Sequence, residues 1–134
     1  DYALSMEGSL KLKELSYIQS EAYAGGELKH GTIALVEKGS LVVCSVTQDN
    51  LKEKIISNMR EVKARGAKVL VITQKKNQDL LEIADHIFFI DNVDSIIAPL
   101  VGVVPMQLLA YYMAEKRGCD IDKPRNLAKS VTVE

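Results

Sequence analysis

KVLVIT, at residues 68–73, is the stretch that decides the fold of this chain. After Lys68 its residues are apolar or β-branched, without the alternation of a half-exposed strand. This pattern predicts a strand buried on both faces, as in a parallel sheet. The run LVVCSVT at 41–47 has the same character, and HIFFI at 86–90 forms a third candidate. Because helical patterns separate the three runs, the sequence predicts an α/β fold with a parallel sheet.

Helical spacing of apolar residues fills the intervals between and around these strands. Gly8 weakens the first helix, and the pair Gly25 and Gly26 suits its end. Pro105 should kink or divide the last helix, whose Leu108, Leu109 and Tyr112 are expected to share a face. The predicted helices cover residues 3–23, from 49 or 50 to about 65, around 80–84, and from near 99 to near 118.

Size and charge bound the possible functions. The chain has 134 residues, a hydrophobic fraction of 47% and a charged fraction of 26%, which fits one globular domain. Its formal net charge is −1, so no basic field is available to hold a nucleic acid or an anionic membrane. No apolar run approaches the roughly 18 residues of a membrane span. We therefore expect neither nucleic acid nor membrane as a partner.

The two cysteines, Cys44 and Cys119, form no CxxC pair and no metal-ligand spacing, so we expect no disulfide framework and no metal site. Reduced thiols fit a cytoplasmic protein. The sequence also lacks a GxGxxG motif, a Walker A loop and a GxSxG elbow, which argues against nucleotide-binding and serine hydrolase chemistry.

Residue type and spacing alone give only weak evidence for catalytic residues in this chain. Lys11 and Glu14 lie three positions apart and share a helix face, where an ordinary solvated ion pair is the simpler interpretation. His30 is expected in a loop without a required task. Lys129 lies in an irregular tail, where exposed lysines are common, although the aliphatic residues around it suggest docking.

Two longer motifs carry a more specific signal. The segment EGSLKLKELSYIQSEAYAGGELKHG at 7–31 and the ending PRNLAKSVTVE at 124–134 closely resemble the glucosamine-6-phosphate synthase family. The resemblance implies a three-layer α/β/α, flavodoxin-like fold of the SIS (sugar isomerase) type. Residues 1–120 would form the second SIS lobe, shortened at its N-terminus by the loss of its first strand. Residues 121–134 would form a C-terminal catalytic tail.

The resemblance also implies residue roles. Lys129 would form an imine with the open-chain ketose, which requires an uncharged amine. Glu14 would move a proton between C1 and C2, a task that suits a partly buried carboxylate. Lys11 would assist this proton traffic, and the backbone at Ala128 would touch the sugar. His30 would open the sugar ring, and in the family this histidine comes from the neighbouring subunit.

The implied reaction converts fructose 6-phosphate and glutamine-derived ammonia to glucosamine 6-phosphate without a metal or organic cofactor. The implied partners are the sugar phosphates, a second copy of the chain, a glutaminase domain and a first SIS lobe. That lobe grips the phosphate with a Ser/Thr-rich loop, which residues 45–48 do not reproduce. The chain alone is therefore expected to turn over little substrate. The alternatives are a regulatory, sugar-phosphate-binding SIS module without chemistry and a piece that serves only in dimer formation.

Overall fold

The computed structural model describes residues 1–125 and contains one parallel sheet of three strands. The strands are β1 (Leu41–Val46), β2 (Lys68–Thr73) and β3 (His86–Phe89), in the spatial order β1-β2-β3. Leu41 pairs with Lys68, and Leu70 pairs with His86. All three strands were predicted from the sequence, and both pairings are parallel as expected.

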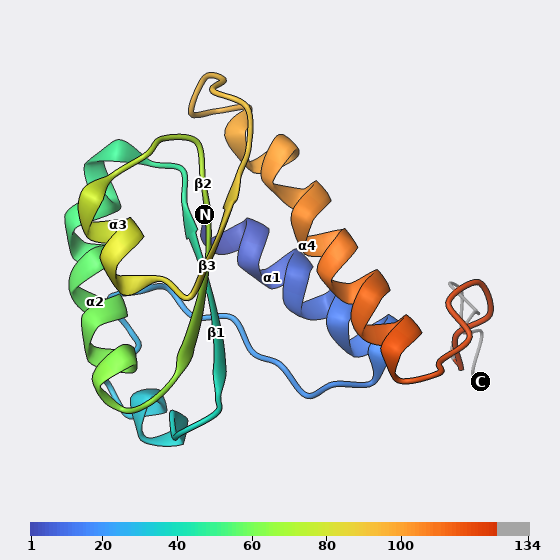
Figure 1. Cartoon of the computed structure of the whole chain (residues 1–134). Coiled ribbons are helices and arrows are strands. Elements are labelled where there is room, and N and C mark those ends of the chain that lie inside the picture. The colour runs from blue at the N-terminus through green and yellow to red at the C-terminus, as the bar shows by residue number, and fades with distance from the viewer. Residues whose placement is uncertain (126–134) are drawn as a thin grey trace, which may run out of the picture.

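Helices cover both faces of the sheet (Figure 1). On one face lie α2 (Lys52–Ala64) and α3 (Gln78–Ile83), and on the other lie α1 (Tyr2–Lys11) and α4 (Ala98–Lys116). Two 3-10 turns, Thr32–Leu35 and Asp49–Leu51, precede β1 and α2. The predicted three-layer α/β/α architecture is confirmed.

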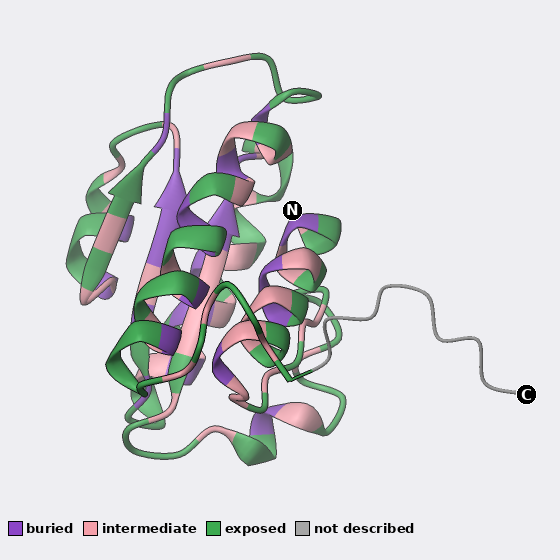
Figure 2. Ribbon diagram, turned by 90° about the vertical axis from the view of Figure 1, so that its right-hand side faces the viewer, coloured by how far each residue is buried: buried purple, intermediate pink, exposed green. Residues whose placement is uncertain are grey.

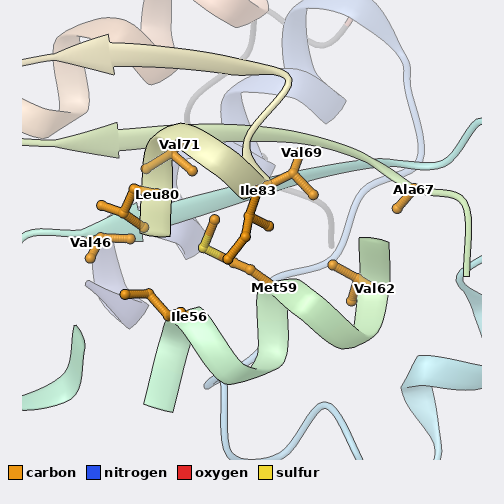
Figure 3. Close-up of a cluster of buried hydrophobic side chains, with 9 residues drawn as sticks. All are labelled: Val46, Ile56, Met59, Val62, Ala67, Val69, Val71, Leu80 and Ile83. Atoms are coloured by element: carbon orange, nitrogen blue, oxygen red, sulfur yellow. The ribbon is translucent and has the colours of Figure 1, made fainter. Parts of the chain in front are cut away.

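The larger core lies between the sheet and the layer of α2 and α3 (Figure 3). Val69 and Val71 of the central strand are completely buried, because strands flank β2 on both sides and helices cover both of its faces. Ile56, Met59 and Val62, spaced three residues apart, supply the inner face of α2. The cluster consists of Val46, Ile56, Met59, Val62, Ala67, Val69, Val71, Leu80 and Ile83.

The second core, formed by Leu4, Ile72, Ile90 and Met106, joins the sheet to α1 and α4. Pro105 does not divide α4, which runs from Ala98 to Lys116, so of its two predicted effects only a kink stays a prediction. Leu108 and Tyr112 are 40% and 54% exposed, and the outward side of α4 is largely green in Figure 2. Its buried side is a stripe of mostly small residues, namely Ala98, Gly102, Pro105, Met106, Ala110 and Ala114.

The first helix is shorter than predicted. It continues past Lys11 as a π-helical turn, Leu12–Ser16, and ends at Tyr17 instead of at Gly25. Tyr17 adopts a left-handed conformation with φ 57°, which no helix can continue through. The chain then turns back, and the hydroxyls of Ser9 and Ser20 each donate to the backbone carbonyl of the other, at 2.9 and 3.0 Å. These side-chain hydrogen bonds compete with helix and stabilise the return.

Candidate functional site

Glu14 lies in the π-helical turn that extends α1. Within this turn the Ser16 hydroxyl donates to the carbonyl of Leu12 at 2.6 Å, and Ser16 is completely buried. Single π-helical turns are rare and occur often at functional sites, because they turn one side chain out of the regular helix register. This irregularity therefore distinguishes Glu14 from an ordinary surface carboxylate.

Lys11 and Glu14 form the ion pair that their spacing predicted. The ammonium nitrogen of Lys11 lies 2.7 Å from a carboxylate oxygen of Glu14 and 3.6 Å from one of Glu7. The hydrogen bond to Glu14 is the main cause that raises the pKa of Lys11 above its ordinary value, and the charges of both carboxylates add to it. Lys11 is therefore a cation at neutral pH, suited to donating a hydrogen bond and not to accepting a proton.

Both side chains remain open to solvent in the described part of the chain. The side chain of Lys11 is 28% exposed and that of Glu14 is 49% exposed. A surface ion pair of this kind contributes about 0.3–0.5 kcal/mol to stability. The partial burial that proton transfer by Glu14 calls for is thus not provided by residues 1–125 alone.

The start of the C-terminal tail lies against the end of this helix. The backbone N–H of Arg125 donates to the hydroxyl of Tyr17 at 2.9 Å, and the Arg125 guanidinium lies 4.2 Å from the centre of the Tyr17 ring. Lys129 and Ala128 fall outside the described residues, so their expected roles stay predictions. Tyr17 carries no local sequence signal of a site, because it lies inside a stretch whose pattern predicts continuous helix.

His30 lies in a loop next to α2, across the sheet from Glu14. It is exposed, and its backbone N–H donates to the carbonyl of Glu27 at 3.0 Å. Its loop is fastened to α2 by a hydrogen bond from Asn58 to the carbonyl of Gly25, at 2.7 Å, and by an ion pair between Lys29 and Glu61. Leu28 packs on the core beneath α2. Because α2 and α1 cover opposite faces of the sheet (Figure 1), the loop of His30, fastened to α2, lies across the sheet from the helix that carries Glu14.

The carboxyl ends of β1 and β2 hold only a small cavity of about 80 Å³. Ligands of α/β proteins commonly bind at this edge, but here the polar groups contact one another. The hydroxyl of Thr47 donates to the carboxylate of Asp1 at 2.5 Å, and Gln48 donates to the carbonyl of Ser95 at 2.9 Å. Lys75 pairs with Asp49 at 2.6 Å. The polar groups at this strand end thus bond to one another, and how the phosphate is held stays a prediction.

Two further observations apply to residues 1–125. No three His, Cys, Asp or Glu side chains gather in the way a metal ion requires. Within the same range, no helix combines the length and the apolar character needed to cross a membrane.

Comparison with known proteins defines the class. Residues 1–116 match the family model described as SIS domain, and the chain belongs to this family. Its whole length is 59% identical to a glutamine–fructose-6-phosphate aminotransferase [isomerizing] of Caldanaerobacter subterraneus subsp. tengcongensis and 57% identical to that of Bacillus subtilis. It spans 22% of each relative's length. The resemblance seen in the two end motifs is thereby confirmed over the whole chain.

Solved structures agree with this assignment. The C-terminal domain of glucosamine-fructose-6-phosphate aminotransferase from Francisella tularensis superposes with a TM-score of 0.80 at 40% identity, over 91% of this chain and 34% of that one. A glucosamine-6-phosphate deaminase from Thermotoga maritima gives a TM-score of 0.73 at 35% identity, over 97% of this chain and 37% of that one.

Proposed function

We propose that this chain forms the C-terminal isomerase part of an enzyme that makes glucosamine 6-phosphate from fructose 6-phosphate and glutamine-derived ammonia. The observation that carries the proposal is the 59% identity to a glutamine–fructose-6-phosphate aminotransferase along all 134 residues. We assign the chemistry to Lys11, Glu14, His30 and Lys129 of this chain. Residues 1–120 act as the second sugar-isomerase lobe, and residues 121–134 act as the catalytic tail. The reaction takes place in the cytoplasm.

In the proposed mechanism, Lys129 adds its uncharged amine to the C2 carbonyl of the open-chain ketose and water leaves, giving an imine. Ammonia then displaces the lysine at C2. Glu14 removes a proton from C1 and returns it to C2, and the proton of the C1 hydroxyl passes to the imine nitrogen, so that C1 becomes an aldehyde and C2 carries the amine. Throughout this exchange the Lys11 ammonium stabilises negative charge near Glu14, which its raised pKa supports.

His30 opens the sugar ring in the site of a second subunit. The position of its loop on the α2 side of the sheet supports this assignment, since Glu14 lies on the α1 side. The cavity at the carboxyl ends of β1 and β2 is small, and the polar groups around it bond to one another. Both features support the further proposal that a separate lobe of the parent enzyme holds the phosphate. The chain alone would then bind substrate weakly and turn over little of it.

The decisive experiment is borohydride reduction of the full-length protein in the presence of fructose 6-phosphate, followed by mass spectrometry of the C-terminal peptide. We expect a hexose adduct at Lys129. Lys129→Arg keeps the charge but cannot form a stable imine, so it should give no adduct. Lys123→Arg, at an exposed position near the start of the same tail, serves as the matched control and should leave adduct formation unchanged.

Two results would reject the proposal. One is a wild-type protein that turns over substrate without an adduct at Lys129. The other is unchanged turnover in Glu14→Gln, compared with Glu7→Gln, whose carboxylate also approaches Lys11 but at the longer distance of 3.6 Å. Substrate binding with no turnover in the intact wild type would favour the regulatory module instead.

A further inference from the structure

Tyr17 occupies an unusual backbone conformation at the end of the π-helical turn. Its φ of 57° and ψ of 28° are left-handed, and it is the only residue other than glycine with a positive φ among residues 1–125. Helices commonly end in this conformation, but glycine is the usual residue because it has no β-carbon to clash. An aromatic residue at this position therefore suggests that its side chain is needed there.

The side chain of Tyr17 makes two separate contacts with one residue, Arg125. The Tyr17 hydroxyl accepts a hydrogen bond of 2.9 Å from the Arg125 backbone N–H. The Arg125 guanidinium lies 4.2 Å from the centre of the Tyr17 ring, within the range of a cation–π interaction. The two residues are 108 positions apart. The Tyr17 side chain thus holds both the backbone and the side chain of Arg125, the last residue that the structure describes.

Because few residues separate Glu14 from Tyr17 and Lys129 from Arg125, the contact between Tyr17 and Arg125 limits the length of free chain between the two candidate catalytic groups. Consecutive α-carbons are about 3.8 Å apart, and Lys129 follows Arg125 by only four positions in the sequence. By the same measure, the α-carbon of Glu14 lies within about 11 Å of that of Tyr17. A short tether of this kind raises the effective concentration of one group near another. Without the contact between Tyr17 and Arg125, the tail would be tethered mainly through its covalent connection to the end of α4.

We propose that Tyr17 is a positioning residue that fastens the C-terminal tail at Arg125, so that Lys129 and Glu14 meet the same substrate. The inference rests on the proposed function, because it gives the tether a purpose. Tyr17 itself does not touch the reacting atoms. Its contribution is to increase the rate at which the tail amine reaches the bound sugar.

The test compares variants of the full-length protein in two measurements: the rate of borohydride-trapped adduct formation at saturating fructose 6-phosphate, and the separation of kcat from KM. Tyr17→Ala removes both contacts and should slow adduct formation by roughly tenfold with little change in KM. Tyr17→Phe keeps the ring and loses the hydroxyl, so it should slow the reaction by roughly threefold. Tyr23→Ala is the matched control, since the Tyr23 hydroxyl bonds to Glu21 in the same returning segment, and it should react at the wild-type rate.

A double variant provides the readout that a merely structural role would not give. Arg125→Ala should slow adduct formation on its own but should add nothing to Tyr17→Ala, because both changes remove the same contact. If Tyr17→Ala does not fold, Tyr17→Phe is combined with Arg125→Ala instead. Tyr17→Phe loses the hydrogen bond to the Arg125 backbone N–H and Arg125→Ala loses the guanidinium contact with the ring, so here the two losses should add to about the loss expected of Tyr17→Ala. Wild-type rates in both Tyr17→Phe and Arg125→Ala, or additive losses when Arg125→Ala is combined with Tyr17→Ala, would overturn the positioning role. Absence of any adduct in the wild type would reject the proposed function itself, so the two failures are distinguishable.

Discussion

A β-carbon placed on Gly8 would lie 2.8 Å from the sulfur of Met106 and 3.2 Å from its β-carbon. Gly8 is buried in α1, and Met106 belongs to the buried side of α4. A second close approach occurs where a β-carbon on Gly102 would lie 2.7 Å from a methyl group of Leu4. The two helices thus pack closely because each has a glycine where the other presents a bulky side chain. Gly8, which weakens the sequence signal of the first helix, is therefore required by the close packing of α1 on α4.

Gly8→Ala should lower the free energy of unfolding by about 1–3 kcal/mol, because the added methyl group overpacks the contact with Met106 and outweighs the gain in helix propensity. Urea denaturation monitored by circular dichroism measures the change. Gly26→Ala is the matched control, since nothing lies within 4 Å of its β-carbon, and we expect a change within about 0.5 kcal/mol. Equal stability of the two variants would contradict the packing argument.

Asp85 should make stability depend on pH in the acid range. Its carboxylate accepts hydrogen bonds from Lys63, from the backbone N–H of Val69 at 2.8 Å and from Lys68 at 3.2 Å. These contacts, the first of them most strongly, hold the pKa of Asp85 well below its usual range. The stabilisation is therefore complete above the unfolded-state pKa of about 3.9 and is lost as the pH falls towards the folded-state pKa.

Asp85→Asn should accordingly be less stable than the wild type at pH 7, and the difference should shrink below about pH 4. Thermal unfolding at several pH values measures it. Asp91→Asn, at an exposed position, is the control and should follow the wild-type curve. A difference between Asp85→Asn and wild type that persists undiminished at low pH would show that the lost charge is not the cause.

Cys44 should be nearly unreactive in the folded protein. It packs against the core beneath α2, and burial raises the pKa of its thiol to about 12. At pH 8 its thiolate fraction is then roughly a thousandfold below that of an ordinary cysteine. Alkylation by iodoacetamide, followed by mass spectrometry of the Cys44 peptide, should be slow in buffer and fast in urea. Similar rates in both conditions would show that the thiol is accessible in the native state.

Lys11 should act through its charge. Because Glu14 and Glu7 raise the pKa of Lys11, the side chain stays protonated across neutral pH. In the full-length protein, Lys11→Arg should keep most of the activity, whereas Lys11→Met should lose about 10- to 100-fold in kcat. The matched control is Lys13→Met, an exposed lysine of the same helical segment. Equal loss in Lys11→Arg and Lys11→Met would indicate that the amine itself takes part in proton transfer.

The placement of His30 and Glu14 on opposite sides of the sheet leads to a test with mixed dimers. His30→Asn and Glu14→Gln should each abolish most of the activity of the full-length protein. When the two variants are unfolded together and refolded, half of the dimers contain one of each and hence one intact site. About a quarter of the wild-type activity should then return. No recovery, with mixed dimers shown by mass spectrometry, would place both residues in the site of a single subunit.

The sequence by itself determined the elements whose signals are local. The strands at 41–47, 68–73 and 86–90 follow from short apolar runs, and α2 follows from the spacing of Ile56, Met59 and Val62. The Lys11–Glu14 pair is equally local, because residues three apart on a helix are neighbours in any fold. The end motifs were specific enough to indicate the family, since they extend over many consecutive residues.

Only the tertiary structure decided where the first helix ends, which side of α4 is buried and what the tail first contacts. The helix stops at Tyr17 and not at the glycines, and α4 buries Gly102 and Ala110 in place of Leu108. The contact of Tyr17 with Arg125 joins residues 108 positions apart. The physical reason is common to all three. A pattern within a short window reports how one element can bury its own side chains, whereas these features depend on how closely two distant elements approach each other.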